Sequence, residues 1–349
     1  MLPAELSNNP NAETLHSLIN QLCTQANPEH ISFIEHTLEN ILKIQKGNPN
    51  KNDLRLIQTA LDELVQSFLM FKDYRDIRKV SIFGSARTKP SHPNYILAKN
   101  TAKKLAEANF LVITGAGPGI MEAGNEGAGK KSFGLHILLP FEQNPNKYVP
   151  KENMIPYRYF FTRKLTFVKE SDAIVLFPGG FGTQDEGFEV LTLMQTGRCS
   201  PRPFIVINYN KSTYWEHWKK YVKTELSDRQ YICPEDIDLI KEFSSPEEIT
   251  NEIAHFYSTY HSIKYHNGTA YMRVNTAPSH ELLSQLNTMF KHLLTSGTFE
   301  THSHTHTPEE KNLYPEKPRL VFSFNHKSYG GLVKLIHFIN SFTKQKKGD

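Results

Sequence analysis

The sequence predicts an α/β protein whose core is a doubly wound, mostly parallel sheet. Between Arg78 and Asn208, short apolar runs alternate with helical segments. Apolar runs without polar alternation are typical of strands buried on both faces. Their alternation with helices favours parallel pairing through right-handed crossovers. Ligands of such sheets bind beyond the carboxyl ends of the strands, where the strand order reverses.

The order of these segments is Rossmann-like. The predicted strands cover residues 80–83, 110–114, 134–139, 172–177 and 204–207. The predicted helices cover residues 95–108, 120–130, 162–170, 185–196 and 214–226. We assign the Rossmann-like domain to residues 76–260, with a further helix over 246–260 at its end.

Both ends of the chain extend this domain. Residues 1–75 form a predicted helical N-terminal extension, because apolar side chains recur at helical spacing over 31–44 and 54–71. Residues 261–349 form a predicted mixed α/β C-terminal extension. Its elements are a helix over 281–294, a loop over 298–307, a strand over 319–324 and a helix over 329–342.

The composition narrows the function classes. Hydrophobic residues at 38% and charged residues at 22% are typical of a soluble globular protein. The net charge of +4 is small and the basic residues are scattered, which favours small anionic ligands and gives no nucleic-acid footprint. No apolar run reaches the roughly 18 residues of a membrane span, and residues 1–20 lack the order of a signal peptide. The cysteines Cys23, Cys199 and Cys233 are odd in number and far apart, so we expect a reducing, cytoplasmic location.

Three predicted strands run into turns of small residues, at 84–87, 115–119 and 178–183. Glycine lets the backbone turn sharply and lets a ligand approach closely, and the helix that follows presents unpaired N–H groups to a phosphate. Three such turns at one edge of a sheet favour a shared anion pocket. The residues expected to contact the ligand are Gly84, Ser85, Gly115, Gly117, Gly119, Gly179, Gly180, Gly182 and Thr183. Thr183 offers its hydroxyl as a helix cap or as a ligand donor.

Two nucleotide motifs are imitated without being met. In the turn at 115–119 the third glycine comes one position early for a dinucleotide fingerprint. The run 124–131 imitates a P-loop, but Lys131 stands where Ser or Thr must hold magnesium, and it falls at the end of a predicted helix. Neither NAD nor ATP is supported, and we expect no cofactor.

Charged residues accompany the third turn. Glu186 lies one turn into the helix that follows it, with Glu189 on the same side. Arg163 and Lys164 start the helix just upstream of the strand at 172–177, and we expect Lys164 beside the ligand. By spacing alone, these residues are equally well interpreted as capping and surface charges.

Residues 178–186, with the sequence PGGFGTQDE, match the PGGxGTxxE signature of the LONELY GUY (LOG) family. Arg163 and Lys164 match the Arg-Lys pair upstream of it. SIFGSAR at 81–87, TGAGPGIMEA at 114–123 and RLVFSFN at 319–325 also resemble the longer bacterial members. The core of the resemblance covers about residues 79–221. These proteins are phosphoribohydrolases that were long described as lysine decarboxylases.

The resemblance implies hydrolysis of nucleoside 5′-monophosphates, cytokinin riboside monophosphates among them, to free base and ribose 5-phosphate. It implies that Arg163 and Glu186 are the catalytic pair. The residues it implies for the phosphate are Gly179, Gly180, Gly182 and Thr183. The chemistry agrees, because breaking an N-glycosidic bond develops positive charge on the ribose that a carboxylate can stabilise. Whether Glu186 acts as nucleophile, base or electrostatic stabiliser stays open.

Other interpretations remain. The main alternative is a non-catalytic nucleotide or cofactor carrier on the same fold, similar to the molybdenum-cofactor carriers, which need no pair like Arg163 and Glu186. A pyridoxal-phosphate decarboxylase is disfavoured because no lysine has the context of a Schiff-base residue. His302, His304 and His306 are better interpreted as part of a flexible loop than as a metal site. We also expect a homo-oligomer, which the resemblance implies.

Overall fold

A computed structural model describes residues 17, 21, 28–139, 144–209, 212–302 and 314–348. The chain divides into two compact units, residues 1–62 and 63–349. In the first unit, helix α2 (Pro28–Lys46) is followed by most of helix α3 (Lys51–Met70), as the spacing of apolar residues predicts. The side chain of Asn50 accepts hydrogen bonds from the backbone of Asn52 and Asp53, and therefore fixes the start of α3.

The centre of the second unit is a seven-stranded sheet in which every neighbouring pair is parallel. Its strands are β1 (Lys79–Phe83), β2 (Leu111–Thr114), β3 (Ser132–Ile137), β4 (Met154–Tyr157), β5 (Ala173–Leu176), β6 (Phe204–Ile207) and β7 (Ile240–Phe243). The strands lie in the order β4-β3-β2-β1-β5-β6-β7. This arrangement confirms the predicted doubly wound α/β fold.

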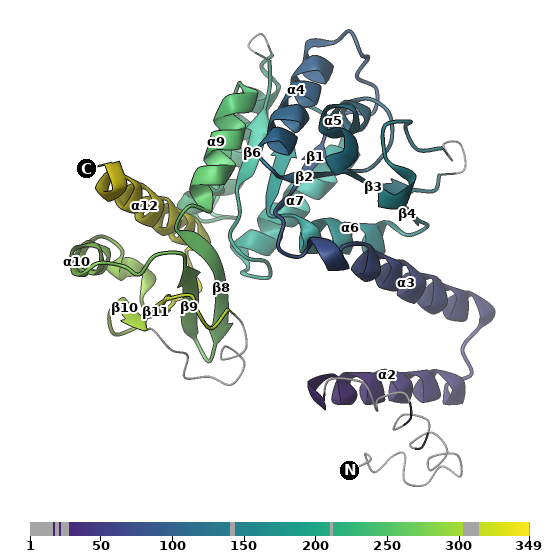
Figure 1. The fold of residues 1–349 in the computed structure, drawn as a ribbon, viewed down its shortest axis with the longest axis horizontal. Helices are drawn as coiled ribbons and strands as arrows, with labels where there is room; N and C mark the ends of the chain where they lie inside the picture. The colour runs from purple at the N-terminus through teal and green to yellow at the C-terminus, as the bar shows by residue number, and fades with distance from the viewer. Residues whose placement is uncertain are drawn as a thin grey trace. The chain divides into compact units, whose positions relative to one another are not determined.

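Helices cover both faces of this sheet (Figure 1). One face carries α4 (Pro93–Glu107), α5 (Ile120–Ala128) and α9 (Pro246–Phe256). The other carries α6 (Phe160–Glu170), α7 (Phe181–Gln195) and α8 (Tyr214–Tyr221), which continues as a π-helical segment over Val222–Ser227. Short 3₁₀ turns lie at Lys72–Tyr74, Gly129–Lys131, Lys151–Asn153, Pro234–Leu239 and Lys291–Leu293. The apolar strands are thus buried on both sides, as their sequences require.

The strand order reverses between β1 and β5. From β1 the chain builds outward to β2, β3 and β4, then returns to place β5 on the other side of β1. The turns after β1 and β5 meet there, because the backbone N–H of Ser85 donates to the carbonyl of Pro178 at 3.1 Å. The reversal therefore brings the first and third glycine turns together at one edge of the sheet.

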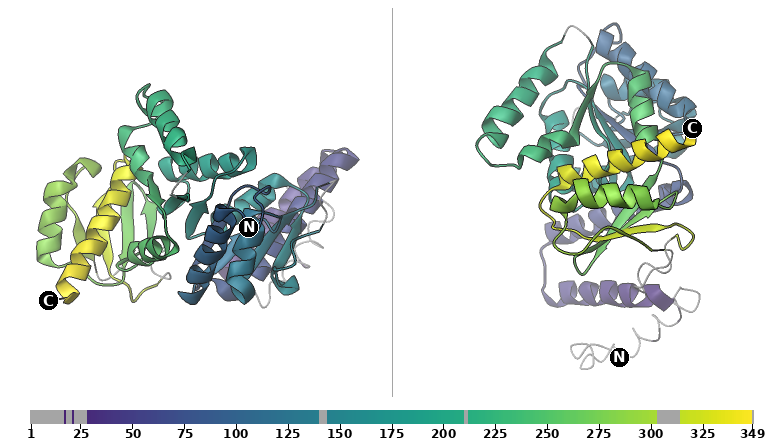
Figure 2. Two further views of the ribbon diagram at one scale, coloured as in Figure 1. Left: turned by 90° about the horizontal axis from the view of Figure 1, so that it is seen from above. Right: turned by 90° about the vertical axis from the view of Figure 1, so that its left-hand side faces the viewer.

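A second, antiparallel sheet follows in the order β10-β11-β9-β8. Its strands are β8 (Tyr260–His266), β9 (Thr269–Val274), β10 (Glu300–His302) and β11 (Arg319–Ser323). Helices α10 (His280–Met289) and α12 (Tyr329–Gly348) lie side by side on one face (Figure 2). The loop predicted over 298–307 is wrong where β10 forms, because residues 300–302 pair with β11. The domain boundaries at residues 75 and 260 stay predictions.

Candidate functional site

A cavity of about 800 Å³ opens at the carboxyl ends of β1, β2 and β5. Its volume lies in the range usual for small-molecule sites. The predicted residues that line it are Gly84, Ser85, Gly115, Gly117, Arg163, Gly179, Gly180, Gly182, Thr183 and Glu186. Gly119 and Lys164 do not line it, so their predicted contact with a ligand stays a prediction. The reversal of strand order thus assembles the three glycine turns and the charged pair around one space.

Gly119 joins the second turn to the first. Its φ is +70°, and a Cβ at this position would come 2.3 Å from the carbonyl oxygen of Ser85. The next residue, Ile120, donates its N–H to that same oxygen at 3.1 Å. Only glycine permits this backbone angle and this approach together, so Gly119 lets the second turn pack directly against the first.

The third turn opens helix α7. Gly180 is its N-cap residue, and the N–H groups of Thr183 and Gln184 donate to the Gly180 carbonyl at 3.1 Å. The helix predicted from residue 185 therefore begins at Phe181, and Gly182 and Thr183 belong to its first turn. Since Gly180 occupies the cap, the Thr183 hydroxyl is not the cap, and no described residue hydrogen-bonds to it. The first turn of a helix is a favourable place for an anion.

Gly180 and Gly182 differ from the other glycines around the cavity. A Cβ on either would meet no atom of the described residues within 4 Å. On Gly179, by contrast, it would come 2.1 Å from Oγ1 of Thr183, and on Gly84 2.7 Å from the side chain of Ile120. Close packing therefore explains why residues 84 and 179 are glycine, but it does not explain why residues 180 and 182 are. The free space there faces the cavity.

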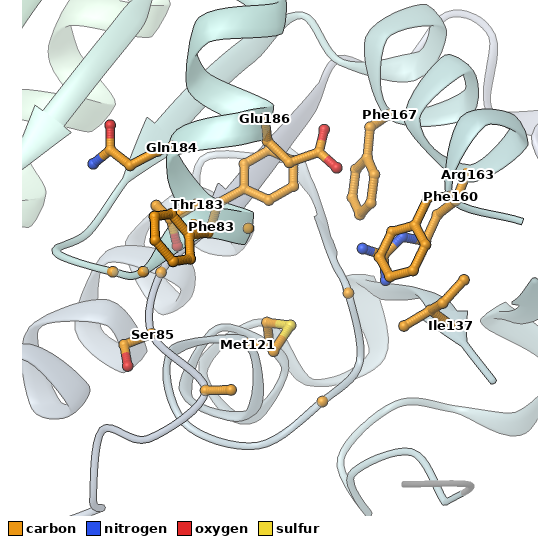
Figure 3. Close-up of a pocket in the computed structure, with 18 of the residues that line it drawn as sticks. Phe83, Ser85, Met121, Ile137, Phe160, Arg163, Phe167, Thr183, Gln184 and Glu186 are labelled. Carbon is orange, nitrogen blue, oxygen red and sulfur yellow. The ribbon is translucent and has the colours of Figure 1, made fainter. Parts of the chain in front are cut away.

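Glu186 carries a buried carboxylate at the cavity wall (Figure 3). The residue is 4% exposed, and its Oε2 has no hydrogen-bond partner within the described part of the chain. Burial raises the pKa of this carboxyl, while Lys164 and then Arg163 act in the opposite direction. A buried carboxyl with an unpartnered oxygen at a cavity wall is a candidate for chemistry rather than for stability.

Arg163 faces the cavity from α6, with the Phe167 ring between it and Glu186 (Figure 3). Its guanidinium lies over the rings of Phe160 and Phe167, with centroid distances of 5.2 and 5.7 Å. Burial lowers the pKa of Arg163, and the charge of Glu186 opposes that effect. Its Nε finds no hydrogen-bond acceptor among the described residues. Arg163 and Glu186 therefore both line one cavity, and each has a buried polar atom that forms no hydrogen bond with a described residue.

Lys164 approaches Glu186 from behind the cavity wall. Its Nζ lies 2.7 Å from Oδ2 of Asp185, 3.9 Å from Oε2 of Glu186 and 3.8 Å from Oε2 of Glu189. Glu186 and Glu189 share one side of α7, as their spacing predicts. In this structure Lys164 acts on the ionisation of Glu186.

Sequence reasoning missed the apolar wall of the cavity. The residues of that wall include Phe83, Met121, Ile137, Leu139, Phe160 and Phe167. Phe83 and Ile137 lie at strand ends, and Met121 and Phe160 lie in first helical turns, a position that was the available signal. Leu139 lies after β3 and Phe167 lies further along α6, so they had no such signal. Arg87 of the first turn also lines the cavity, is exposed, and forms no ion pair with a described residue. A site with an apolar wall and a few polar groups suits a flat organic base linked to an anion.

Metal and P-loop interpretations gain nothing from the geometry. Within the described residues, no group of three or more His, Cys, Asp or Glu side chains could hold a metal ion. His302 hydrogen-bonds to Glu300, whereas His304 and His306 lie outside the described residues. The ammonium of Lys131 donates to the carbonyl of Ala106 and to the side chain of Asn109, so both of these hydrogen bonds are structural.

Residues 118–253 match the family model described as "Possible lysine decarboxylase", which is the model of the LOG family. The family match thus covers residues 118–253, which lie within the seven-stranded-sheet part of the chain. The match contains the α6 and α7 segments and the third glycine turn, but begins after the first turn. A comparison with curated proteins finds no match. Among the described residues, no helix is both long and apolar enough to cross a membrane.

Solved structures also resemble about half of this chain. The molybdenum cofactor binding protein of Rippkaea orientalis is 22% identical, with a TM-score of 0.36 over 51% of this chain and 94% of that one. The molybdenum cofactor carrier protein of Chlamydomonas reinhardtii is 15% identical, with a TM-score of 0.37 over 51% of this chain and 96% of that one.

Proposed function

We propose that this protein hydrolyses the N-glycosidic bond of nucleoside 5′-monophosphates, releasing the free base and ribose 5-phosphate. The observation that carries the proposal is the pairing of Glu186 and Arg163 at one cavity. Each has a buried polar atom without a hydrogen-bond partner in the described chain, and they face the glycine turn that opens α7. Unsatisfied buried polar atoms at a cavity indicate groups reserved for a ligand.

The 5′-phosphate is assigned to the first turn of α7. Gly180 and Gly182 leave space above backbone N–H groups at the positive end of the helix dipole. The hydroxyl of Thr183 adds a donor. The exposed guanidinium of Arg87 lies in the facing turn and can approach the phosphate from the opening of the cavity.

The bond cleavage is assigned to Glu186. As the bond between the base and C1′ breaks, the electron pair leaves with the base and the ribose becomes cationic. The Glu186 carboxylate stabilises that cation or orients the water that adds to C1′. Arg163 supplies positive charge where negative charge develops on the leaving base or lies on the phosphate. The base receives a proton and the sugar receives the hydroxyl of water, so the reaction balances without a cofactor.

The test is an assay of free base released from a panel of nucleoside 5′-monophosphates and from the matching nucleosides. We expect hydrolysis of at least one nucleotide, with its nucleoside a much poorer substrate because it lacks the anchored phosphate. Equal rates on nucleotide and nucleoside would remove the phosphate role of the glycine turns.

The catalytic assignment is tested with Glu186→Gln and Arg163→Ala. Glu186→Gln keeps the shape of the side chain and removes its charge, so we expect a loss of roughly 100- to 1000-fold in kcat with a smaller change in nucleotide affinity. The matched control is Glu189→Gln, which removes a more exposed carboxylate paired to the same lysine. If Glu186→Gln hydrolyses nucleotide like Glu189→Gln, the assignment is wrong and the carrier interpretation leads.

We further propose that the enzyme works in a reducing, cytoplasmic setting. Cys199 and Cys233 form no disulfide in the described part of the chain, and Cys23 lies outside it. Free thiols far apart in a chain are typical of that compartment. Locating a tagged chain by cell fractionation tests this.

A further inference from the structure

Helix α6, which carries Arg163, begins without a cap of its own. Its N-cap residue is Tyr159, which makes no side-chain capping hydrogen bond within the described residues. The first N–H groups of a helix lack partners inside the helix, so contacts from other elements help to hold its start in place. Arg163 follows within the first turn and a half, so its direction depends on how this start is held.

One such contact comes from α3, about 100 residues earlier in the chain. Glu63 is 5% exposed, and its carboxylate accepts a hydrogen bond from the backbone N–H of Arg158 at 2.6 Å. It also accepts from the hydroxyl of Thr162, which lies in the first turn of α6. A carboxylate at this point complements the positive end of the α6 dipole. Glu63 thus ties the residue before the N-cap of α6 and a side chain of its first turn to one buried carboxylate.

A second contact lies one turn further along α3. The hydroxyls of Ser67 and Tyr157 are 2.5 Å apart, and Tyr157 donates to Thr166 on α6 at 3.1 Å. All three residues are buried. The part of α3 from Glu63 onward is therefore held against α6 by two polar contacts one helical turn apart, and the segments lie side by side in Figure 1. Buried polar networks of this kind fix a single geometry.

We propose that Glu63 is a positioning residue for Arg163: it holds the start of α6 so that the guanidinium faces the cavity. The inference rests on the proposed function, in which Arg163 acts on the nucleotide. It also assigns a role to the chain before the LOG family match, because Glu63 lies outside residues 118–253. A displacement of about 1 Å at a catalytic group can cost about 100-fold in rate.

The kinetic test compares Glu63→Gln with Asp62→Asn. Asp62 is the exposed neighbour on the same helix, so its variant removes a carboxylate without touching α6. In Glu63→Gln an amide NH₂ replaces one carboxylate oxygen, so it faces either the N–H of Arg158 or the hydroxyl of Thr162, and two donors meet there. We expect kcat of Glu63→Gln to fall about 10- to 100-fold with KM changed less than about threefold, well below the unfolding temperature. Asp62→Asn should keep the wild-type kcat.

A double-mutant cycle identifies the contact responsible. Thr162→Val removes the hydroxyl that donates to Glu63 and keeps the shape of the side chain. If the two groups act through one contact, the double variant Glu63→Gln/Thr162→Val loses no more rate than the more affected single variant. Fully multiplicative losses would overturn the proposed route through Thr162.

A readout independent of activity separates this inference from the proposed function. Amide hydrogen exchange at Arg158, whose N–H donates to Glu63, should be faster in Glu63→Gln than in the wild type, because glutamine keeps only one of the two carboxylate oxygens. If the wild type hydrolyses no nucleotide, the proposed function fails, while faster exchange at Arg158 still supports the anchoring of the start of α6 by Glu63. Unchanged exchange, or an unchanged kcat in an active protein with altered exchange, overturns the inference.

Discussion

Replacing Gly182 with alanine separates binding from folding at the third glycine turn. A Cβ here meets no described atom within 4 Å, and the residue lies in the first turn of α7. Alanine is favoured over glycine in helices by about 0.5–1 kcal/mol. The folded protein should therefore be as stable as the wild type or slightly more stable. The new methyl group, however, stands where the phosphate is proposed to approach the backbone.

The size of the binding loss follows from that placement. A phosphate displaced from close N–H contacts loses charge-assisted hydrogen bonds of about 1.5–3 kcal/mol each. Losing one of them weakens binding about tenfold or more, since 1.4 kcal/mol corresponds to a factor of ten. Gly179→Ala is the contrasting variant. Its Cβ would come 2.1 Å from Oγ1 of Thr183, so overpacking should destabilise the fold by about 1–3 kcal/mol.

The assay pairs thermal unfolding with calorimetric titration of ribose 5-phosphate. We expect Gly182→Ala to unfold at or above the wild-type temperature and to bind ribose 5-phosphate at least about tenfold more weakly. Gly179→Ala should unfold at a lower temperature. If Gly182→Ala binds like the wild type, the open space above α7 is not the phosphate site and the reasoning fails.

Three further predictions concern charge and assembly. Because burial raises the pKa of Glu186 and Lys164 lowers it, the acidic limb of the kcat–pH profile should lie above an ordinary glutamate pKa, and Lys164→Met should move it to still higher pH. The same raised pKa means that ionised Glu186 destabilises the fold as pH rises through it, so Glu186→Gln should raise the unfolding temperature at neutral pH, with a gain that vanishes in acid. Light scattering should give at least a dimer of the 40.0 kDa chain, because apolar side chains of helices α2 and α3 are exposed, Phe33 at 72% and Leu69 at 65%; a monomer mass would contradict this.

The interior of the main sheet could be predicted from the sequence, whereas its edges could not. Strands β1, β2, β5 and β6 are uninterrupted apolar runs because both their faces are covered. The edge strands β4 and β7 are only partly buried, so their sequences, MIPY and IKEF, lack that signature. Their pairing is decided by neighbours distant in sequence.

The second sheet contained one signal that sequence reasoning did not use. Asn267 and Gly268 both adopt positive φ and join β8 to β9, and Asn-Gly between alternating residues is the usual mark of such a hairpin. Strand β10 offered no comparable signal. It is three residues long and forms only by pairing with β11.

At the site, the spacing of residues in the sequence identified the residue types, whereas their burial and the distances between them depend on the fold. The motif around Glu186 predicted a carboxylate near a glycine turn, but its burial, which raises the pKa, is a property of the folded chain. The ion pairs of Lys164 depend on the same packing. Glu63 could not be linked to Thr162 by any local pattern, since they are 99 residues apart.

The adjacency of β1 and β5 sets the order in which the cavity can form during synthesis. The N–H of Lys79 donates to the side chain of Asp172, 93 residues later, while β2, β3 and β4 are made in between. Until β5 leaves the ribosome, one side of β1 is an unpaired strand edge, which is open to wrong partners. A nascent chain that ends before α7 carries the first two glycine turns but lacks the turn to which we assign the phosphate. On that proposal, ligand stabilises only chains whose synthesis has passed Glu186, and it cannot help the earlier intermediates to fold.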